Sequence, residues 1–317
     1  MNNNNNTNTK PILNDVLCIN NKHPRDKHIQ FFEKEHKYTI DFESNIKYTS
    51  VTTWVHEHFE KFDADKIITK MMTGKGWKEG HKYWGMTPDQ IKAQWDTNKD
   101  AVAGAGTNLH FEIECFHNNS KLHTNNTNYT NKELLELYLS NNETKLLELS
   151  IEWQYFIHFI KDHQHLKPYR TEWTVFNEDI KISGSIDMVY ENPDGTLSIY
   201  DWKRTKNITR INNFNKFGLS LPICHLPDAN FWHYALQLNI YKYILESKYN
   251  KQIKDLYLVR LHPNAVEKNY ELIQLPNLSR EIPNHPAVEE RRSRWVKGHS
   301  GLEQSQQHAT FEGSPSS

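Results

Sequence analysis

A chain of 317 residues has room for one core with an additional arm, and its 12% aromatic content can build a hydrophobic interior, which excludes wholesale disorder. Its formal net charge of -1 gives no overall attraction to nucleic acid, so any nucleic-acid-binding surface has to be local. Three scattered cysteines exclude a self-contained four-cysteine zinc or iron–sulfur site. The sequence has no signal peptide and no stretch near the roughly 20 apolar residues that span a bilayer, which predicts a soluble intracellular protein without a membrane partner.

Composition divides the chain into a central region between two polar tails. The first residues are almost all Asn and Thr, and the last segment is rich in Ser, Gln and Gly, so we expect both ends to be disordered. A polar stretch at 118–131 predicts a surface loop. The expected segments are a disordered tail at 1–20, strands and a helical arm at 21–100, a core at 101–282, and a largely disordered tail at 283–317.

Hydrophobic periodicity predicts a mostly helical first half. Thr87 and Pro88 are a typical N-cap and first helical residue. Leu109, Ile113 and Phe116 share one helix face at spacings of four and three residues, which indicates a second helix after this one. The expected elements are a hairpin at 30–42, helices at 50–59, 87–98 and around 109–116, and a long helical stretch at 134–161 that breaks near residue 141.

The second half of the chain has the residue pattern of strands around one strong helix. Runs rich in Val, Ile, Tyr and Trp alternate with turn residues before and after that helix. This order predicts a mixed α/β domain built on a central sheet. The expected strands lie at 169–176, 180–191, 196–203, 255–261 and 270–275, and the helix at 231–249.

The turn at 192–195 sets the register of the hairpin that contains it. Its sequence Asn-Pro-Asp-Gly suits a type I turn followed by a bulged left-handed Gly. In that register Asp187 lies opposite Asp201, and the side chain of Lys203 shares their face because side chains alternate along a strand. A two-residue turn at 194–195 would instead place the two acids on opposite faces.

Two opposed carboxylates predict a metal site. Directly opposite residues have Cβ atoms about 4.5–5.5 Å apart, so two acids there repel unless a divalent cation lies between them. Carboxylate oxygens favour Mg²⁺ or Mn²⁺. We expect Lys203, held near apolar walls, to lose part of its preference for charge, and to position or deprotonate a water or to stabilise a negative transition state. An ordinary Asp-x-Lys pair on an exposed strand remains the alternative.

Four motifs in order resemble the PD-(D/E)XK nuclease superfamily, in its RecB-like and lambda-exonuclease-like branch. They are also similar to exonucleases of large DNA viruses and to the mitochondrial single-strand exonuclease. The resemblance implies a restriction-endonuclease-like fold, in which helices flank a central mixed sheet, with an N-terminal helical arm. The motifs are Gly106–His110, Gly184–Asp187, Asp201–Lys203 and Gln237–Tyr241.

The resemblance also implies roles for individual residues. Asp187, Asp201 and Lys203 would be catalytic, and the cofactor would be Mg²⁺ or Mn²⁺ without an iron–sulfur cluster. Gln237 and Tyr241 would hold the lysine or the phosphate, although an ordinary amphipathic helix surface is the alternative. Glu114 and Glu172 are secondary candidates that would orient a water or a second metal, or merely balance nearby basic groups. The implied metal ligands are His110, Asp187, Asp201 and the main-chain carbonyl of Trp202.

Two basic groups are candidates for contact with nucleic acid. Lys75, Lys78 and Lys82 are interleaved with Trp77, Tyr83 and Trp84. Basic residues beside exposed aromatic rings are suited to binding single-stranded nucleic acid. The alternative is a solvated face with its aromatics buried in the core. The first group is Arg204, Lys206 and Arg210, and the second is Lys75, Lys78 and Lys82.

The leading hypothesis is a metal-dependent DNA exonuclease that acts on single strands or duplex ends in replication, recombination or repair. A structure-specific endonuclease with the same chemistry is the first alternative. A non-catalytic nucleic-acid-binding module and a hydrolase of another phosphoester also remain open, as does assembly into a homo-oligomer.

Overall fold

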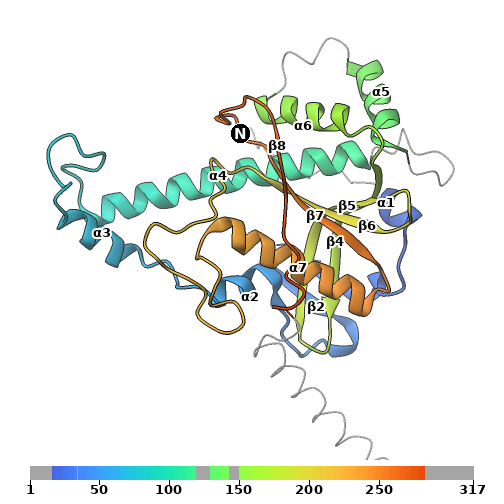
Figure 1. The fold of residues 1–317 in the computed structure, drawn as a ribbon, viewed down its shortest axis with the longest axis horizontal. Coiled ribbons are helices and arrows are strands. Elements are labelled where there is room, and N and C mark those ends of the chain that lie inside the picture. Colours follow the sequence, from blue (N-terminus) through green and yellow to red (C-terminus); the bar gives the residue numbers. More distant parts are fainter. Residues whose placement is uncertain (1–15, 34, 119–128, 143–149, 283–317) are drawn as a thin grey trace, which may run out of the picture.

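The computed structural model describes residues 16–33, 35–118, 129–142 and 150–282. Helices cover both faces of a central sheet, and one long helix extends far beyond it (Figure 1). This is the mixed α/β fold that the sequence predicts, with the helical arm on one side. Residues 1–15 of the N-terminal tail predicted at 1–20, the whole predicted tail at 283–317, and residues 119–128 of the predicted loop lie outside the described residues.

Most of the predicted elements are present. The strands are β1 (Ile29–Phe32), β2 (Lys37–Ile40), β3 (Thr49–Ser50), β4 (Lys167–Asn177), β5 (Ile182–Glu191), β6 (Leu197–Lys203), β7 (Ile253–Arg260) and β8 (Glu271–Gln274). The α-helices are α1 (Val16–Asn20), α2 (Val51–Glu57), α3 (Ala64–Met72), α4 (Pro88–His117), α5 (Asn131–Asn142), α6 (Ile151–Asp162) and α7 (Asn230–Lys248). Two short 3-10 helices, η1 (Asp26–His28) and η2 (Asp41–Glu43), flank the β1–β2 hairpin. None of the described helices is both long enough and apolar enough to cross a membrane.

The sheet contains antiparallel and parallel neighbours. Its order is β3-β5-β6-β7-β8, and β4 pairs with β5 as well. The pairs β4–β5, β5–β6 and β7–β8 are antiparallel, whereas β3–β5 and β6–β7 are parallel. Parallel neighbours need a crossover, and α7 supplies the one between β6 and β7.

The predicted register of the β5–β6 hairpin is confirmed. Met188 pairs with Tyr200, and Glu191 pairs with Leu197. The N–H of Gly195 donates to the carbonyl of Asn192 (2.9 Å), and Gly195 has a φ of 80°, in the left-handed region that favours glycine. The competing two-residue turn is therefore wrong.

Two hydrophobic clusters hold the helices against the sheet. On one face, Val189 and Ile199 pack with residues of α2 and α7. On the other face, Tyr190 and Trp202 pack with α4, α5 and α6. Every residue of β6 except Lys203 is buried, because helices cover both faces of this strand.

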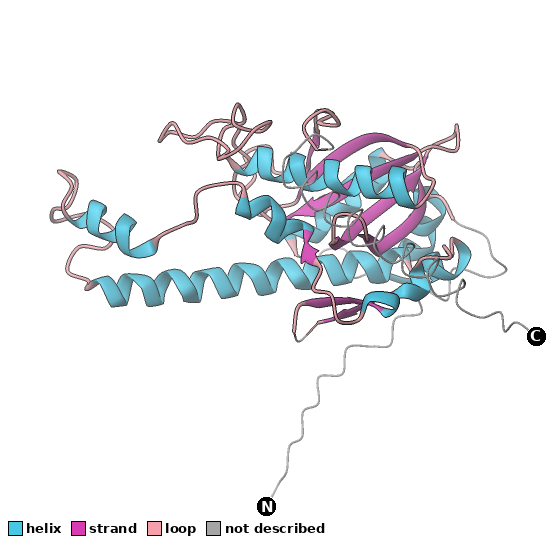
Figure 2. Cartoon of the chain, turned by 90° about the horizontal axis from the view of Figure 1, so that it is seen from below, coloured by secondary structure: helices cyan, strands magenta, loops and turns pink. Residues whose placement is uncertain are grey.

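Helix α4 is one helix of 30 residues, where the sequence analysis expects two. The expectation of a break is wrong because the segment 99–106 contains three alanines, which favour a helix, and no proline, so its two glycines do not end the helix. Thr87 caps the helix in a full capping box with Gln90, as its N-cap position predicts. At 1.5 Å per residue the helix is about 45 Å long. Its first half projects from the body towards α3 (Figures 1 and 2).

Among the described α-helices and strands, three were not predicted. Strand β3 has only two residues and cannot show a period, whereas α3 has an apolar face that the sequence analysis missed. Helix α1 lies within the segment that the sequence analysis assigns to the N-terminal tail. It buries Leu17, whose N–H donates to the side-chain oxygen of Asn118 (3.0 Å).

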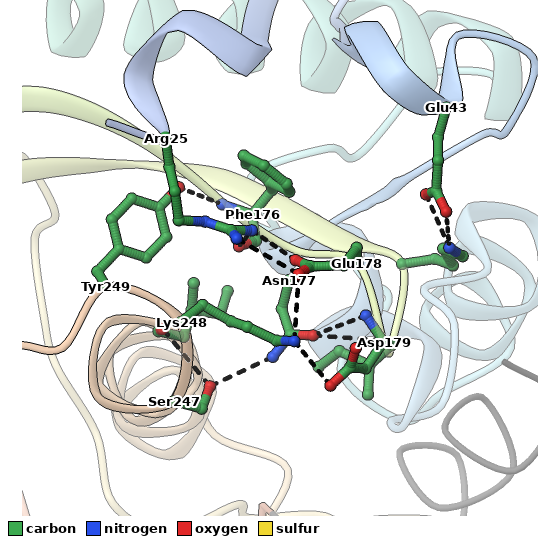
Figure 3. A network of polar contacts seen from close by, with 12 residues as sticks. Arg25, Glu43, Phe176, Asn177, Glu178, Asp179, Ser247, Lys248 and Tyr249 are labelled. Atoms are coloured by element: carbon green, nitrogen blue, oxygen red, sulfur yellow. Dashed lines mark hydrogen bonds and ion pairs between the residues drawn. The ribbon is translucent and has the colours of Figure 1, made fainter. Parts of the chain in front are cut away.

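A network of ion pairs joins three distant segments at one end of the sheet (Figure 3). Glu178, in the turn after β4, pairs with Arg25 (2.5 Å) and with Lys248 at the end of α7 (3.2 Å). Lys248 also pairs with Asp179 (2.8 Å). The guanidinium of Arg25 lies over the ring of Phe176, 4.0 Å from its centre. Opposite charges alternate throughout this network.

Candidate active site

The site lies where β5 and β6 separate. Along one edge of β5, β3 pairs with residues 182–183 and β6 pairs with residues 188–191, so residues 184–187 lie between the two partners. Asp187 and Asp201 would form the next pair of the hairpin, but the pairing ends at Met188 and Tyr200. Instead, the Asp187 carboxylate accepts a hydrogen bond from the main-chain N–H of Trp202 (3.1 Å). The separation thus opens the sheet at the predicted acids.

His110 reaches this opening from the second half of α4. Its Nε2 lies 2.9 Å from the carbonyl oxygen of Trp202. A carbonyl only accepts, so Nε2 carries a proton, and a neutral ring presents the lone pair of Nδ1. Nδ1 lies 3.5 Å from a carboxylate oxygen of Asp187 and 3.9 Å from one of Glu172. A histidine fixed in this way through its other nitrogen is typical of a metal ligand.

Glu172 comes from the middle of β4, on the far side of β5 from the β6 hairpin. It has a φ of 41°, a left-handed conformation that a non-glycine residue adopts at a cost of order 1–3 kcal/mol. Its carboxylate accepts a hydrogen bond from the Ser185 hydroxyl (3.0 Å). Burial, followed by the negative charges of Asp187 and Glu114, raises the pKa of Glu172 to about 8. The acids here are thus gathered without enough positive charge to balance them.

The donor set fits a divalent cation. One ligand atom each from His110, Glu172 and Asp187 lies within 4.8 Å of the others, and among the residues that the structure describes this is the group with that geometry. A cavity of about 350 Å³ adjoins it, lined in part by His110, Glu172, Glu114 and Glu33. Nitrogen and carboxylate donors next to an accessible cavity suit Mg²⁺ or Mn²⁺ with room for water or substrate.

Asp201 and Lys203 form a pair beside this group. The Lys203 ammonium lies 2.6 Å from a carboxylate oxygen of Asp201. Burial raises the pKa of Asp201 to about 6, against the lowering effect of the lysine. Burial lowers the pKa of Lys203, but the carboxylates of Asp201 and Asp187 more than offset this, so its pKa is raised. The expectation that Lys203 loses part of its preference for charge is therefore wrong, because the two carboxylates outweigh the effect of burial.

Helix α7 lines the site from one face of the sheet. The side-chain amide of Gln237 donates to the second carboxylate oxygen of Asp201 (3.4 Å). Gln237 and Tyr241 are 9% and 4% exposed, so they do not form a solvated helix surface. A Cβ at Gly184 would lie 2.8 Å from the Tyr241 ring, which explains why this position of the strand motif is a glycine.

Three further residues reach the site without having been predicted. The ammonium of Lys203 lies 4.8 Å from the ring centre of Tyr234. Tyr234 precedes Gln237 by three residues, and this helix spacing could have revealed it. Burial and the charges of Glu172 and Asp187 raise the pKa of Tyr38 to about 12. Tyr38 and Glu33 belong to the predicted β1–β2 hairpin, but no sequence pattern connects that hairpin to the site.

None of the predicted nucleic-acid contacts belongs to the group of His110, Glu172 and Asp187. Arg204 forms an ion pair with Glu152 (2.8 Å), and Arg210 lies over the ring of Phe231. Lys75, Lys78 and Lys82 lie between α3 and α4, where the ammonium of Lys82 is 4.9 Å from the ring centre of Tyr83. The start of α4 is about 33 Å from His110 along the helix. The carbonyl of Lys206 accepts a hydrogen bond from Arg260 (2.7 Å).

Comparison with known proteins identifies the family. The model of the PD-(D/E)XK nuclease superfamily matches residues 101–310, about two thirds of the chain. The chain belongs to this superfamily. The matched range includes all four sequence motifs and the whole acidic site. No curated protein matched the chain.

Membership confirms the restriction-endonuclease-like fold and identifies the chain as a nuclease that uses divalent metal. The donor group of His110, Glu172 and Asp187 is consistent with that chemistry. Glu172, a secondary candidate in the sequence analysis, belongs to this group, whereas Asp201 lies outside it and pairs with Lys203. The role of each residue and the branch of the superfamily remain predictions.

Proposed function

We propose that the chain is a metal-dependent DNA exonuclease that acts in replication, recombination or repair. The observation that carries this proposal is the convergence of His110, Glu172 and Asp187 on one point beside the Asp201–Lys203 pair. The cavity lined by His110 and Glu172 would give a phosphodiester access to this group. The superfamily supports hydrolysis of nucleic acid as the reaction.

His110, Glu172 and Asp187 would hold the metal, with Asp201 and the Trp202 carbonyl as further candidates. When bound, Mg²⁺ or Mn²⁺ polarises the scissile phosphate and lowers the pKa of a bound water. The Trp202 carbonyl orients His110 through Nε2 and leaves Nδ1 directed at the acids. In this arrangement the Trp202 carbonyl positions His110 as a metal ligand. The alternative is that the carbonyl itself coordinates the metal.

Lys203 supplies positive charge next to the reacting phosphate. Its raised pKa keeps the ammonium protonated, so we assign it to stabilising the negative charge that develops on the phosphoryl oxygens. Asp201 and Gln237 hold this lysine through a chain of contacts. Tyr241 fills the space above Gly184 and fixes the face of α7 that carries Gln237.

Cleavage of end-labelled DNA tests the reaction, its metal requirement and its direction together. We expect single- or double-stranded linear DNA to be shortened with Mg²⁺ or Mn²⁺ and left intact with EDTA. Lys203→Ala should abolish cleavage, while Lys254→Ala, which removes a surface lysine paired with Asp194, should leave it unchanged. Full activity of Lys203→Ala would overturn the assigned mechanism.

Exonuclease action is favoured over endonuclease action by the arm beside the site. Helix α4 connects His110 to the projecting segment around α3, so a strand bound along this arm would lead towards the acids (Figure 1). An enzyme that needs an end degrades linear DNA and spares covalently closed circles. Cutting of sealed circles at a comparable rate would instead establish the structure-specific endonuclease.

A further inference from the structure

The connection from β6 to α7 exposes an unusual amount of apolar surface. This loop, residues 204–229, begins directly after Lys203 and ends just before Tyr234 and Gln237, so both of its ends are at the site. Phe214 and Ile211 are 74% and 73% exposed. Phe217, Leu219 and Leu221 are exposed as well. Five large apolar side chains exposed on one loop point to an interaction site.

The loop is held in a defined shape that keeps these side chains outside. The Asn212 amide donates to the carbonyl of Asp228 (2.6 Å), which closes the loop near its base. The N–H of Gly218 donates to the carbonyl of Leu226 (3.0 Å), and a Cβ at Gly218 would lie 2.6 Å from the carbonyl oxygen of Ile223. The exposed side chains are therefore presented by a folded support.

The loop lies against the arm. The N–H of Leu219 donates to the carbonyl of His58 (2.9 Å), and Lys216 pairs with Glu60 (2.8 Å). The ammonium of Lys70, on α3, is 5.8 Å from the ring centre of Phe214. The arm adds its own exposed aromatics, Phe62 and Trp84. We call residues 60–86 together with 204–229 the arm–loop surface.

The arm–loop surface is basic in a chain that is slightly acidic. It contains ten Lys and Arg but five Asp and Glu, although the whole chain has a formal net charge of -1. Positive charge mixed with exposed aromatic rings favours a partner with both negative charge and flat apolar groups. Single-stranded nucleic acid has both, because its phosphates are regularly spaced and its bases have free faces. Duplex DNA buries those faces in its own stack.

We infer that the arm–loop surface binds unpaired, single-stranded DNA, with bases stacked on Phe214 and the arm aromatics and phosphates held by the surrounding lysines. This inference rests on the proposed function, for which it names the substrate class. The loop and α4 both lead to the metal-binding group, so a strand held here reaches it. A second copy of the chain is a weaker candidate occupant, because protein interface cores are depleted in lysine.

Binding without cleavage tests the inference directly. Fluorescence anisotropy in EDTA would compare the full chain on a labelled oligothymidylate, on an abasic strand of equal length, and on a duplex. We expect the oligothymidylate to bind at least about fivefold more tightly than either, since stacking contributes about 1–3 kcal/mol per base. The abasic strand keeps the phosphates, so this difference isolates the bases.

Substitutions assign the effect to the surface. Phe214→Ala and Trp84→Ala should each weaken binding of oligothymidylate by about fivefold or more and leave the abasic strand unaffected, while Phe214→Trp restores affinity. Phe42→Ala is the matched control, because Phe42 is 53% exposed on η2, outside the arm–loop surface. Circular dichroism of each variant would verify folding.

Three outcomes would overturn the inference. The first is equal affinity for the oligothymidylate and the abasic strand. The second is that the Phe214→Ala and Trp84→Ala variants both bind the oligothymidylate as tightly as Phe42→Ala does. The third is that light scattering shows the wild type to be a dimer and the Phe214→Ala variant to be a monomer. This result would assign the surface to a second copy of the chain. DNA cleavage by the wild type in Mn²⁺ is measured separately, so failure of the proposed function is distinguishable from failure of this surface.

Discussion

Two glutamates, six residues apart, experience opposite electrostatic environments. Glu178 lies between Arg25 and Lys248, and although burial opposes it, its hydrogen bonds and charge contacts lower its pKa. Glu172 lies among Asp187 and Glu114, and burial together with these charges raises its pKa to about 8. Both carboxylates contact the same sheet, so the difference comes from their neighbours.

The difference separates a structural charge network from a functional one. In the network around Glu178 each acid has a basic partner, so the charges stabilise the junction of the N-terminal segment, the β4–β5 turn and α7. In the site several acids converge, and within the described part of the chain the ammonium that pairs with one of them is that of Lys203. Uncompensated buried charge destabilises a fold, so its presence is explained by a ligand that restores the balance.

The largest expected effect is the loss of activity in Asp187→Asn. Removing this carboxylate should lower the rate of DNA cleavage by about a hundred- to a thousandfold, because it takes a charged ligand from the metal-binding group. Its free energy of unfolding in EDTA should stay equal or rise, since like-charge repulsion is relieved. Cleavage kinetics and urea denaturation measure the two quantities. A strongly destabilised Asp187→Asn variant would contradict the contrast between the site and the network around Glu178.

In the charge network, Glu178→Gln should show the reverse pattern, a loss of stability with little change in activity. This change leaves Arg25 and Lys248 without their shared carboxylate, and it should lower the free energy of unfolding by about 2 kcal/mol. The value is below that of a fully buried pair because these side chains are partly exposed. The cleavage rate at a temperature where the variant is folded should change little. Loss of activity with unchanged stability would contradict the structural role.

A smaller effect is expected in the pH dependence of stability. When folding raises the pKa of a carboxyl group, ionisation of that group at a pH above its folded pKa lowers the stability of the folded state. The metal-free wild type should therefore gain stability as the pH falls from about 8 towards about 4.3. Glu172→Gln should remove this gain and be more stable by about 1 kcal/mol at pH 9, a modest value because solvent screens a partly exposed group.

The Glu178 network should contribute with the opposite sign. Its lowered pKa gives stability that is present above the ordinary pKa of Glu and is lost as the pH falls through the folded value. Urea denaturation in EDTA between about pH 3 and pH 9 separates the two contributions. A Glu172→Gln variant with the pH profile of the wild type would show that Glu172 is not the source of the gain.

The strands and the hairpin register could be predicted because they depend on local patterns. The turn at 192–195 fixed the pairing of β5 and β6, and the capping residues fixed the start of α4. The end of the ladder before Asp187 could not be predicted, since it depends on long-range pairing, with β3 beside the start of β5 and β7 beside β6.

The raised pKa of Lys203 and the position of Glu172 could not be predicted either, because both depend on tertiary contacts. Sequence spacing places Lys203 beside Asp201 but does not show that two acids outweigh burial. Glu172 joins His110 and Asp187 only because β4 pairs with β5 and Glu172 adopts a left-handed conformation there. Short-range patterns thus identified the chemistry, and long-range packing decided which residues converge.

The binding of Mn²⁺ without nucleic acid tests the central claim, that the acids form a cation site, most directly. Isothermal titration calorimetry of the full chain at pH 8 should give saturable binding that is lost in Asp187→Asn and retained in Glu178→Gln. Proton release on binding should accompany it, because the metal displaces the proton that Glu172 holds at its raised pKa. Equal Mn²⁺ affinity of wild type and Asp187→Asn, or no binding by the wild type at millimolar Mn²⁺, would contradict the account.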